Sequence, residues 1–270
     1  MHSEDLAVLA ELYDIITPSK REMFDRIAAD RTNYITVALE NVFQEHNASA
    51  VLRSCDCFGI QNLHVIEKDN QYKVQRDIAL GAGRWVDMYN YDRGPEPEID
   101  CIKNLKEKGF RIIATTPHTN DVTINDLNLD SPMAFVFGTE RRGISPEIME
   151  LADEFVKIPM YGFTESFNIS VSAAITLNVI RERLENSSID WKLNALSQSI
   201  NFAIDTTQAA QQQGAAAQVT GLANGGYGNV NFLTGLGKAW QFSSHHDGRG
   251  IFNVNLARAR SCFKVRQRAF

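Results

Sequence analysis

The sequence predicts an α/β fold in which helices cover both faces of a mostly parallel sheet. Apolar runs suited to strands alternate with segments of helical spacing between residues 31 and 190. The run at residues 133–137 is apolar throughout, as expected for a strand buried on both faces. Three polar segments, at residues 47–53, 137–143 and 158–170, each adjoin such a run. Because ligands of open α/β sheets bind outside the carboxyl ends of the strands, these segments predict a site there.

Composition and charge narrow the class of protein. The 270 residues are 44% hydrophobic and 22% charged, which is typical of a soluble globular protein. No run reaches the roughly 18 apolar residues of a membrane helix, so no membrane partner is expected. The net charge of −6 is uneven, because residues 191–270 hold eight Lys/Arg and only two acids. Such a basic segment suits either RNA binding or a solvated tail.

The first helices and strands are predicted from the spacing of apolar residues and from the residues that start or end helices. Residues 1–30 predict a helical extension of two short helices, separated by a break at Thr17-Pro18-Ser19. Residues 34–39 are β-rich and predict the first strand of the core. Asn47 then caps a helix that ends at Gly59.

The later elements follow the same alternation. Residues 62–66 predict a strand. The segment 68–97 is polar and is interrupted by Gly and Pro, so irregular structure is predicted there. The remaining elements are a helix at 98–108 that ends at Gly109, strands at 110–114, 133–137 and 154–158, and a helix at 169–184. Four apolar residues of this last helix share one face, namely Val171, Ala174, Ile175 and Val179.

The chain changes character after Trp191. Stretches rich in Gln and Ala and then in Gly and Asn show no sustained period of 3.6 or 2. The sequence therefore predicts three parts: a helical extension at 1–30, an α/β domain at 31–190, and an atypical, poorly ordered tail at 191–270.

The four cysteines predict neither a disulfide framework nor a metal site. They lack ligand spacing, and no apolar signal segment follows Met1, so reduced thiols and a cytoplasmic location are expected. Cys55 and Cys57 are predicted to be buried. His245-His246-Asp247 has no third ligand at useful spacing, and no metal is expected there.

The first polar segment places Asn47 and Arg53 on one strand–turn–helix unit. A guanidinium at the ligand-binding edge of a sheet is suited to hold a phosphate through two parallel hydrogen bonds. Two simpler interpretations of Arg53 stand beside this one. Its stem lies along apolar surface, or its charge pairs with Asp56 three residues further on.

The second segment leaves a buried strand through Gly138, and a glycine there permits a ligand to approach the backbone closely. Glu140 beside paired arginines suits a local ion pair or the organisation of a site. An ordinary strand-to-helix turn is the alternative, with Ser145 and Pro146 starting the helix. Neither a Walker lysine nor a G-x-G-x-x-G fingerprint is present, which excludes those phosphate cradles and argues against a dinucleotide-dependent oxidoreductase.

The third segment begins with the apolar loop 158–163, which suits a flat heterocycle and a thioether. Ser166 and Asn168 follow it, and each is either a helix cap or a polar group of the site.

Together the three segments resemble the signature motifs of the SpoU/TrmH family, which are RNA ribose 2′-O-methyltransferases of the SPOUT class. The motifs are Asn47-x-x-Ala50-x-x-Arg53, Phe137-Gly-x-Glu140-x-x-Gly143 and Ile158-Pro-Met…Ser166-Phe-Asn168-x-Ser170. The chain is most similar to the branch that methylates guanosine 18 in the D-loop of tRNA. The resemblance implies a C-terminal deep trefoil knot, a homodimer, S-adenosylmethionine as cofactor, tRNA as partner and no metal.

The resemblance also implies roles for particular residues. Arg53 would be the catalytic arginine, and four residues would surround the reacting centre, namely Asn47, Glu140, Ser166 and Asn168. Four others would line the cofactor, namely Thr115, Gly138, Ile158 and Phe167. The same reaction on ribosomal RNA, and a non-catalytic knotted RNA-binding protein, remain alternatives. The tail departs from the family, which usually ends in a charged amphipathic helix that helps to hold tRNA.

Overall fold

The structure is a computed structural model that describes residues 16–117, 122–139 and 142–193, together with four strands between residues 217 and 256. The chain divides into two units, one formed by residues 29–193 and the other by residues 1–28 with 194–270. Helix α2 (Pro18–Ala29) confirms one of the two predicted N-terminal helices, and the other lies outside the described residues. No helix among the described residues is long and apolar enough to cross a membrane.

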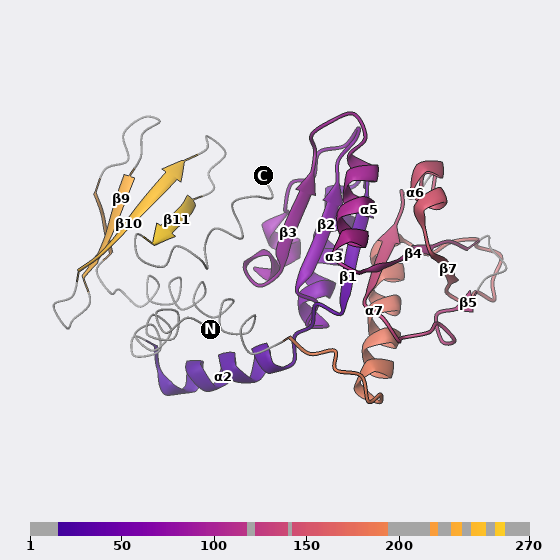
Figure 1. Ribbon diagram of the computed structural model, residues 1–270, viewed down its shortest axis with the longest axis horizontal. Coiled ribbons are helices and arrows are strands. Elements are labelled where there is room, and N and C mark those ends of the chain that lie inside the picture. Colours follow the sequence, from indigo (N-terminus) through magenta and orange to yellow (C-terminus); the bar gives the residue numbers. More distant parts are fainter. Residues whose placement is uncertain are drawn as a thin grey trace. The chain divides into compact units, whose positions relative to one another are not determined.

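A seven-stranded sheet forms the centre of the 29–193 unit (Figure 1). Every strand pairing in it is parallel, in the order β3-β2-β1-β6-β4-β7-β5, which confirms the predicted parallel α/β fold. The strands are β1 (Ile35–Glu40), β2 (Asn62–Ile66), β3 (Asp87–Tyr91), β4 (Arg111–Thr115), β5 (Val122–Thr123), β6 (Met133–Phe137) and β7 (Glu154–Lys157).

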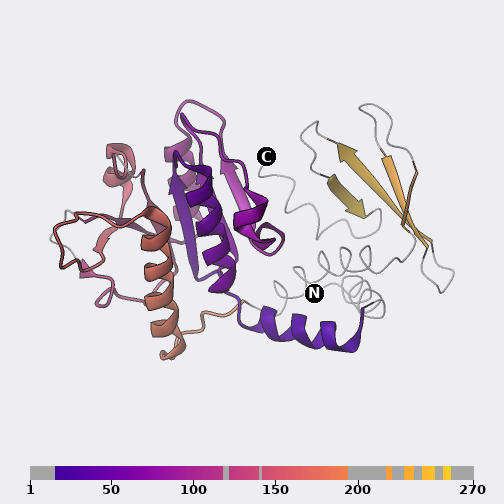
Figure 2. The same ribbon diagram turned by 180° about the vertical axis from the view of Figure 1, so that it is seen from behind.

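Helices cover both faces of the sheet, as Figures 1 and 2 show from opposite sides. Helices α3 (Glu45–Cys57) and α7 (Ile169–Glu185) lie on one face, and α5 (Pro97–Glu107) and α6 (Pro146–Leu151) on the other. Because side chains alternate along a strand, Val37 and Leu39 of β1 enter the core under α3 and α7, whereas Ala38 enters the core under α5 and α6. Apolar positions on both faces explain why β6 is apolar without interruption.

The segment 68–97 is irregular only in part, and the prediction of irregular structure was wrong for residues 76–91. It contains α4 (Arg76–Ala79), the short 3-10 helix η1 (Ala82–Arg84) and the edge strand β3. Every residue of β3 is half-buried, so its polar sequence carries no apolar pattern that would mark a strand. Ala79 and Ala82 are buried in the same core as the inner side of α3, which holds the segment against that helix.

Helix α3 begins earlier than predicted. It starts at Glu45 after Gln44, whose side chain makes no capping bond, so Asn47 lies inside the helix and the prediction that it caps α3 was wrong. The predicted end is confirmed: Gly59 has a φ of +70°, and the N–H of Ile60 donates to the carbonyl of Cys55 at 2.8 Å. Cys55 is buried as expected, whereas Cys57 is exposed. Cys262 lies outside the described residues.

Helix α7 buries a different face from the predicted one. The N–H of Ser170 donates to Asn168 Oδ1 at 2.8 Å, which confirms that Asn168 caps the helix. Val171, on the predicted buried face, is 44% exposed. The helix is apolar on two sides, so spacing alone did not identify the side that meets the sheet. The buried residues are Ile169, Ala173, Thr176, Leu177, Ile180 and Leu184.

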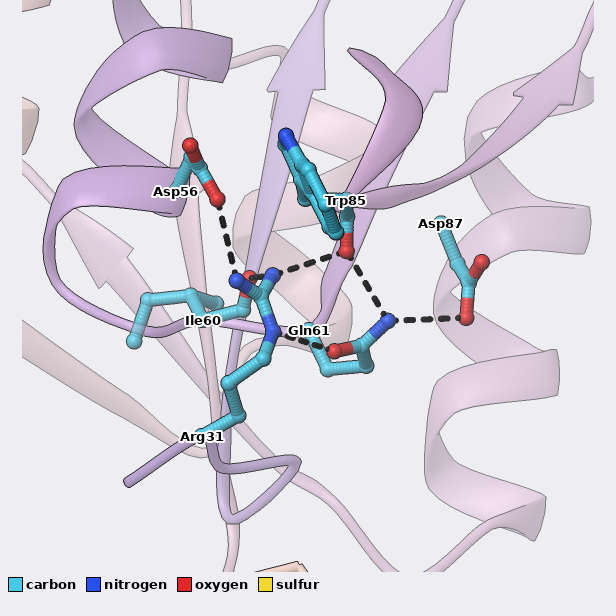
Figure 3. A network of polar contacts seen from close by, with 6 residues as sticks. All are labelled: Arg31, Asp56, Ile60, Gln61, Trp85 and Asp87. Carbon is cyan, nitrogen blue, oxygen red and sulfur yellow. Dashed lines mark hydrogen bonds and ion pairs between the residues drawn. The ribbon is translucent and has the colours of Figure 1, made fainter. Parts of the chain in front are cut away.

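A buried arginine joins several elements at the amino edge of the sheet, where the strands begin (Figure 3). Arg31 is 4% exposed and pairs with Asp56 at the end of α3 at 2.9 Å. Its guanidinium also donates to Gln61 Oε1 at 2.6 Å and to the Trp85 carbonyl at 2.8 Å. One side chain thus links the segment before β1 to α3, β2 and β3, and removing it would leave several buried acceptors unpaired.

His64 of β2 is a buried histidine on the α5 face. It is 2% exposed, stacks on Tyr89 with ring centroids 4.9 Å apart, and has Nδ1 at 3.2 Å from the Tyr91 hydroxyl. Burial, with a smaller contribution from the Lys108 charge, lowers the pKa of His64 to about 3. The imidazole therefore stays neutral in the folded protein.

Replacing His64 is expected to flatten the stability of the protein against pH. Below pH 6.5 the His64 imidazole binds a proton in the unfolded chain but not in the folded chain. As the pH falls toward the folded-state pKa, the free energy of unfolding therefore decreases by up to about 1.4 kcal/mol per pH unit. Between pH 6.5 and 5 the wild type should lose about 2 kcal/mol more than His64→Phe, as measured by urea unfolding. Parallel pH profiles for the two proteins would show that His64 is not held neutral.

The described residues of the tail form an antiparallel sheet in the order β11-β10-β9-β8. No strand was predicted there from the sequence, and His245 and His246 lie in β10 while Asp247 lies outside the described residues. The division into parts 1–30, 31–190 and 191–270 stays a prediction. The strands are β8 (Ala217–Thr220), β9 (Gly228–Leu233), β10 (Ala239–His246) and β11 (Phe252–Leu256).

Candidate active site

The strand order gathers three of the predicted cofactor residues at one edge. Strands β6, β4 and β7 are neighbours, and Thr115 ends β4 while Gly138 and Ile158 directly follow β6 and β7. The Thr115 hydroxyl donates to the Val136 carbonyl of β6 at 2.8 Å, which fixes the two strand ends against each other. The carboxyl edge of the sheet thus carries all three residues, on adjacent strands.

A hydrogen bond between two side-chain amides joins the first segment to the third. Asn168 Nδ2 donates to Asn47 Oδ1 at 3.1 Å, across 121 positions of sequence. Asn47 is 3% exposed, and its Nδ2 donates to Gln44 Oε1 at 3.0 Å. Asn168 therefore caps α7 through the oxygen of its amide and bonds to α3 through the nitrogen.

The turn after β6 is closed by its own backbone. Thr139 and Gly143 exchange two backbone hydrogen bonds of 3.0 Å, and Gly143 has a φ of +69°. A Cβ on Gly138 would lie 2.2 Å from the carbonyl carbon of Gly143. The missing side chain of Gly138 therefore leaves room for residues 143–144 of its own turn. Glu140 lies outside the described residues.

Glu40 anchors this turn, although it was not among the residues predicted from the sequence. The N–H of Ser145, the capping residue of α6, donates to Glu40 Oε2 at 3.0 Å. Glu40 ends β1 and is 6% exposed; burial raises its pKa, which the Ser145 hydrogen bonds partly offset. A carboxylate directly after an apolar strand is the signal that could have identified it.

Arg53 stands apart from the amide pair. It is exposed on α3, six residues and so about 9 Å along the axis beyond Asn47, and it forms no ion pair or hydrogen bond with any described residue. Asp56 pairs with Arg31, so the expected alternative of an Arg53–Asp56 pair was wrong. The Arg53 guanidinium is left available for a ligand.

The loop before α7 exposes large apolar side chains. Tyr161 is 97% exposed, Phe163 is fully exposed, and Phe167 is 41% exposed. Ser166 is exposed as well and bonds to no described residue. These side chains lie in the same loop as Ile158, which is half-buried beside the strand ends.

These groups fit S-adenosylmethionine. Backbone donors and acceptors at three neighbouring strand ends suit an adenine edge, and the half-buried and exposed apolar side chains suit its face and the sulfonium substituents. The described residues contain no cluster of three or more His, Cys, Asp or Glu that could hold a metal ion.

A parallel sheet with three polar segments at its carboxyl edge defines the class of α/β methyltransferase that the motifs resemble. The family model described as the SpoU rRNA Methylase family matches residues 34–178. The chain belongs to this family, and it is 38% identical to the tRNA (guanosine(18)-2′-O)-methyltransferase of Borreliella burgdorferi. That match covers 74% of this chain and 89% of the relative.

Two solved structures have a fold similar to that of this chain. The tRNA modifying enzyme TrmH/SpoU of A. aeolicus is 27% identical with a TM-score of 0.61, over 73% of this chain and 98% of that one. The SpoU methyltransferase AviRb of Streptomyces viridochromogenes, solved with AdoMet, shares the fold at 21% identity and a TM-score of 0.50. That match covers 60% of this chain and 65% of AviRb.

Proposed function

We propose that the protein transfers a methyl group from S-adenosylmethionine to the ribose 2′-hydroxyl of guanosine 18 in the D-loop of tRNA, in the cytoplasm. The observation that carries the proposal is the Asn47–Asn168 hydrogen bond, which joins the first and third motifs near the strand ends that carry Thr115, Gly138 and Ile158. The names of the Borreliella and Aquifex relatives support tRNA as the substrate. Ribosomal RNA is the second candidate, favoured by the description of the family.

The cofactor supplies an activated methyl group, and the protein supplies position. Thr115, Gly138, Ile158 and Phe167 hold the cofactor, chiefly through backbone groups of the strand ends. Arg53 binds a phosphate of the target nucleotide with its free guanidinium, and its charge stabilises the 2′-oxygen as the proton leaves. In-line displacement depends on this positioning for much of its rate.

The remaining motif residues organise the reacting centre. The amide pair of Asn47 and Asn168 holds the start of α7 against α3, which keeps the third motif in register with the first. Ser166 and Glu140 complete the polar surroundings of the ribose. Glu40 and Ser145 hold the second motif against the end of β1.

We also propose a deep trefoil knot and a homodimer. The support for the knot is the family resemblance together with the position of β4 between β6 and β7. The support for the homodimer is the second apolar side of α7, where Val171 is 44% exposed, and the exposed aromatic residues of the preceding loop. A second copy that covers these side chains would remove a large apolar patch from water.

Methyl transfer distinguishes the candidate functions. Labelled S-adenosylmethionine is incubated with the full chain and either unmodified tRNA or unmodified ribosomal RNA, and label in the RNA is counted. Label in tRNA and not in ribosomal RNA is expected. Label only in ribosomal RNA would move the proposal to the second candidate, and label in neither with intact cofactor binding would indicate the non-catalytic alternative.

A further inference from the structure

Four exposed cations on α3 and the segment 73–84 are not neutralised by neighbouring carboxylates. The 29–193 unit is acidic overall, with 17 Lys/Arg against 25 Asp/Glu. Each of the four is exposed, and none forms an ion pair with a described residue. We call them the basic strip; its members are Arg53, Lys73, Arg76 and Arg84.

Nearby carboxylates are engaged elsewhere. Asp56 pairs with Arg31 at 2.9 Å. Glu45 accepts from Gln75 Nε2 at 3.3 Å, and Glu67 accepts from the N–H of Tyr72 at 2.9 Å. Asp77 is the exposed acid that remains on α4, against two cations within the segment 73–76. The strip therefore keeps a local positive charge on an acidic body.

Contacts between α3 and the segment 72–84 bring the strip together. The Ser49 hydroxyl accepts from the N–H of Gln75 at 2.9 Å, and a Cβ on Gly83 would lie 3.6 Å from Leu52 Cδ2. The segment thus runs along the side of α3 that carries Ser49 and Leu52. At about 100° per residue, Arg53 projects only about 40° from Ser49, on the solvent side of the same flank. Arg84 directly follows Gly83, while Lys73 and Arg76 lie on either side of Gln75.

We infer that the basic strip binds the phosphates of the RNA strand next to the target nucleotide. The inference rests on the proposed function, in which Arg53 holds the phosphate of that nucleotide. From Arg53, the segment 72–84 continues the positive surface away from the reacting centre. Guanidinium and ammonium groups on such a surface bind the RNA backbone without reading bases, so they contribute affinity and position rather than choice of sequence.

The test replaces the three strip residues that are not assigned to catalysis. In Lys73→Gln/Arg76→Gln/Arg84→Gln, the KM for unmodified tRNA is expected to rise about tenfold or more, and the salt dependence of tRNA binding should weaken by about two to three units of log–log slope. The turnover at saturating tRNA and the Kd for S-adenosylmethionine should not change. The control, Lys103→Gln/Lys106→Gln/Lys108→Gln, removes three charges from the α5 region on the other face of the sheet, together with the ion pair of Lys106 with Asp153.

Two outcomes would overturn the inference: a wild-type KM and salt slope in the strip variant, or an equal effect in the control, which would mean that net charge alone matters. Binding of fluorescent unmodified tRNA is measured for the same proteins without cofactor. That readout keeps the inference separable from the proposed function, because weaker binding by the strip variant alone supports the strip even if no methyl is transferred. Equal binding by wild type and strip variant contradicts it whatever the activity.

Discussion

Gly138→Ala is expected to abolish measurable cofactor binding and to destabilise the protein. The added Cβ would lie 2.2 Å from the carbonyl carbon of Gly143 and 2.3 Å from both its oxygen and the nitrogen of Ile144. These are backbone atoms, so no side chain can turn away, and the turn that carries the second motif must open. Overpacking of this kind costs about 3 kcal/mol, which corresponds to roughly a hundredfold loss of affinity if the bound state needs the closed turn.

Calorimetric titration with S-adenosylmethionine and urea unfolding measure the two effects. Gly83→Ala is the matched control, because its Cβ meets only Leu52 Cδ2 at an ordinary 3.6 Å. It should bind the cofactor as the wild type does. Normal cofactor binding by Gly138→Ala would contradict the close packing of residues 143–144 on Gly138.

Arg53→Ala is expected to lower methyl transfer by about 100-fold or more without loss of fold or cofactor affinity. The side chain is exposed and pairs with no described residue, so its removal should change stability by less than about 0.5 kcal/mol. Single-turnover transfer, cofactor titration and thermal unfolding are measured on the same preparations.

Arg53→Lys is the informative companion variant. It keeps the positive charge but loses the planar fork, so it should recover phosphate attraction without recovering the wild-type rate. A parallel loss of cofactor binding and stability in Arg53→Ala would instead assign Arg53 a structural role. Full activity in Arg53→Lys would mean that charge alone is sufficient.

Strands with apolar residues on both faces were predictable from the sequence. Residues 133–137 form a strand at the predicted position, because a parallel sheet covered by helices requires apolar side chains at successive positions. Residues 62–66 also form a strand at the predicted position, although Asn62 and His64 are polar. The same reasoning failed for β3, an edge strand whose half-buried residues tolerate a polar sequence. It failed again for α7, because this helix is apolar on two sides and the spacing of its residues does not show which side is buried.

The sequence indicated which residues belong to the candidate site better than it indicated which of them contact one another. The motif spacing identified Asn47 and Asn168, but their mutual hydrogen bond depends on packing of α3 against α7, which no local pattern records. Gly138 was identified from the sequence as a glycine of the site, but the packing of residues 143–144 on it was not predicted. Glu40 and Ser145 lie 105 positions apart and meet only because β1 and β6 are neighbours in the sheet.

The most direct measurement of the central claim compares two tRNA transcripts that differ in one oxygen atom. One carries guanosine at position 18, and the other carries 2′-deoxyguanosine there. With labelled S-adenosylmethionine, the first should accept one methyl per molecule, recovered as 2′-O-methylguanosine after digestion, and the second should accept none while binding equally well. Equal methylation of both transcripts would contradict transfer to the 2′-hydroxyl of guanosine 18.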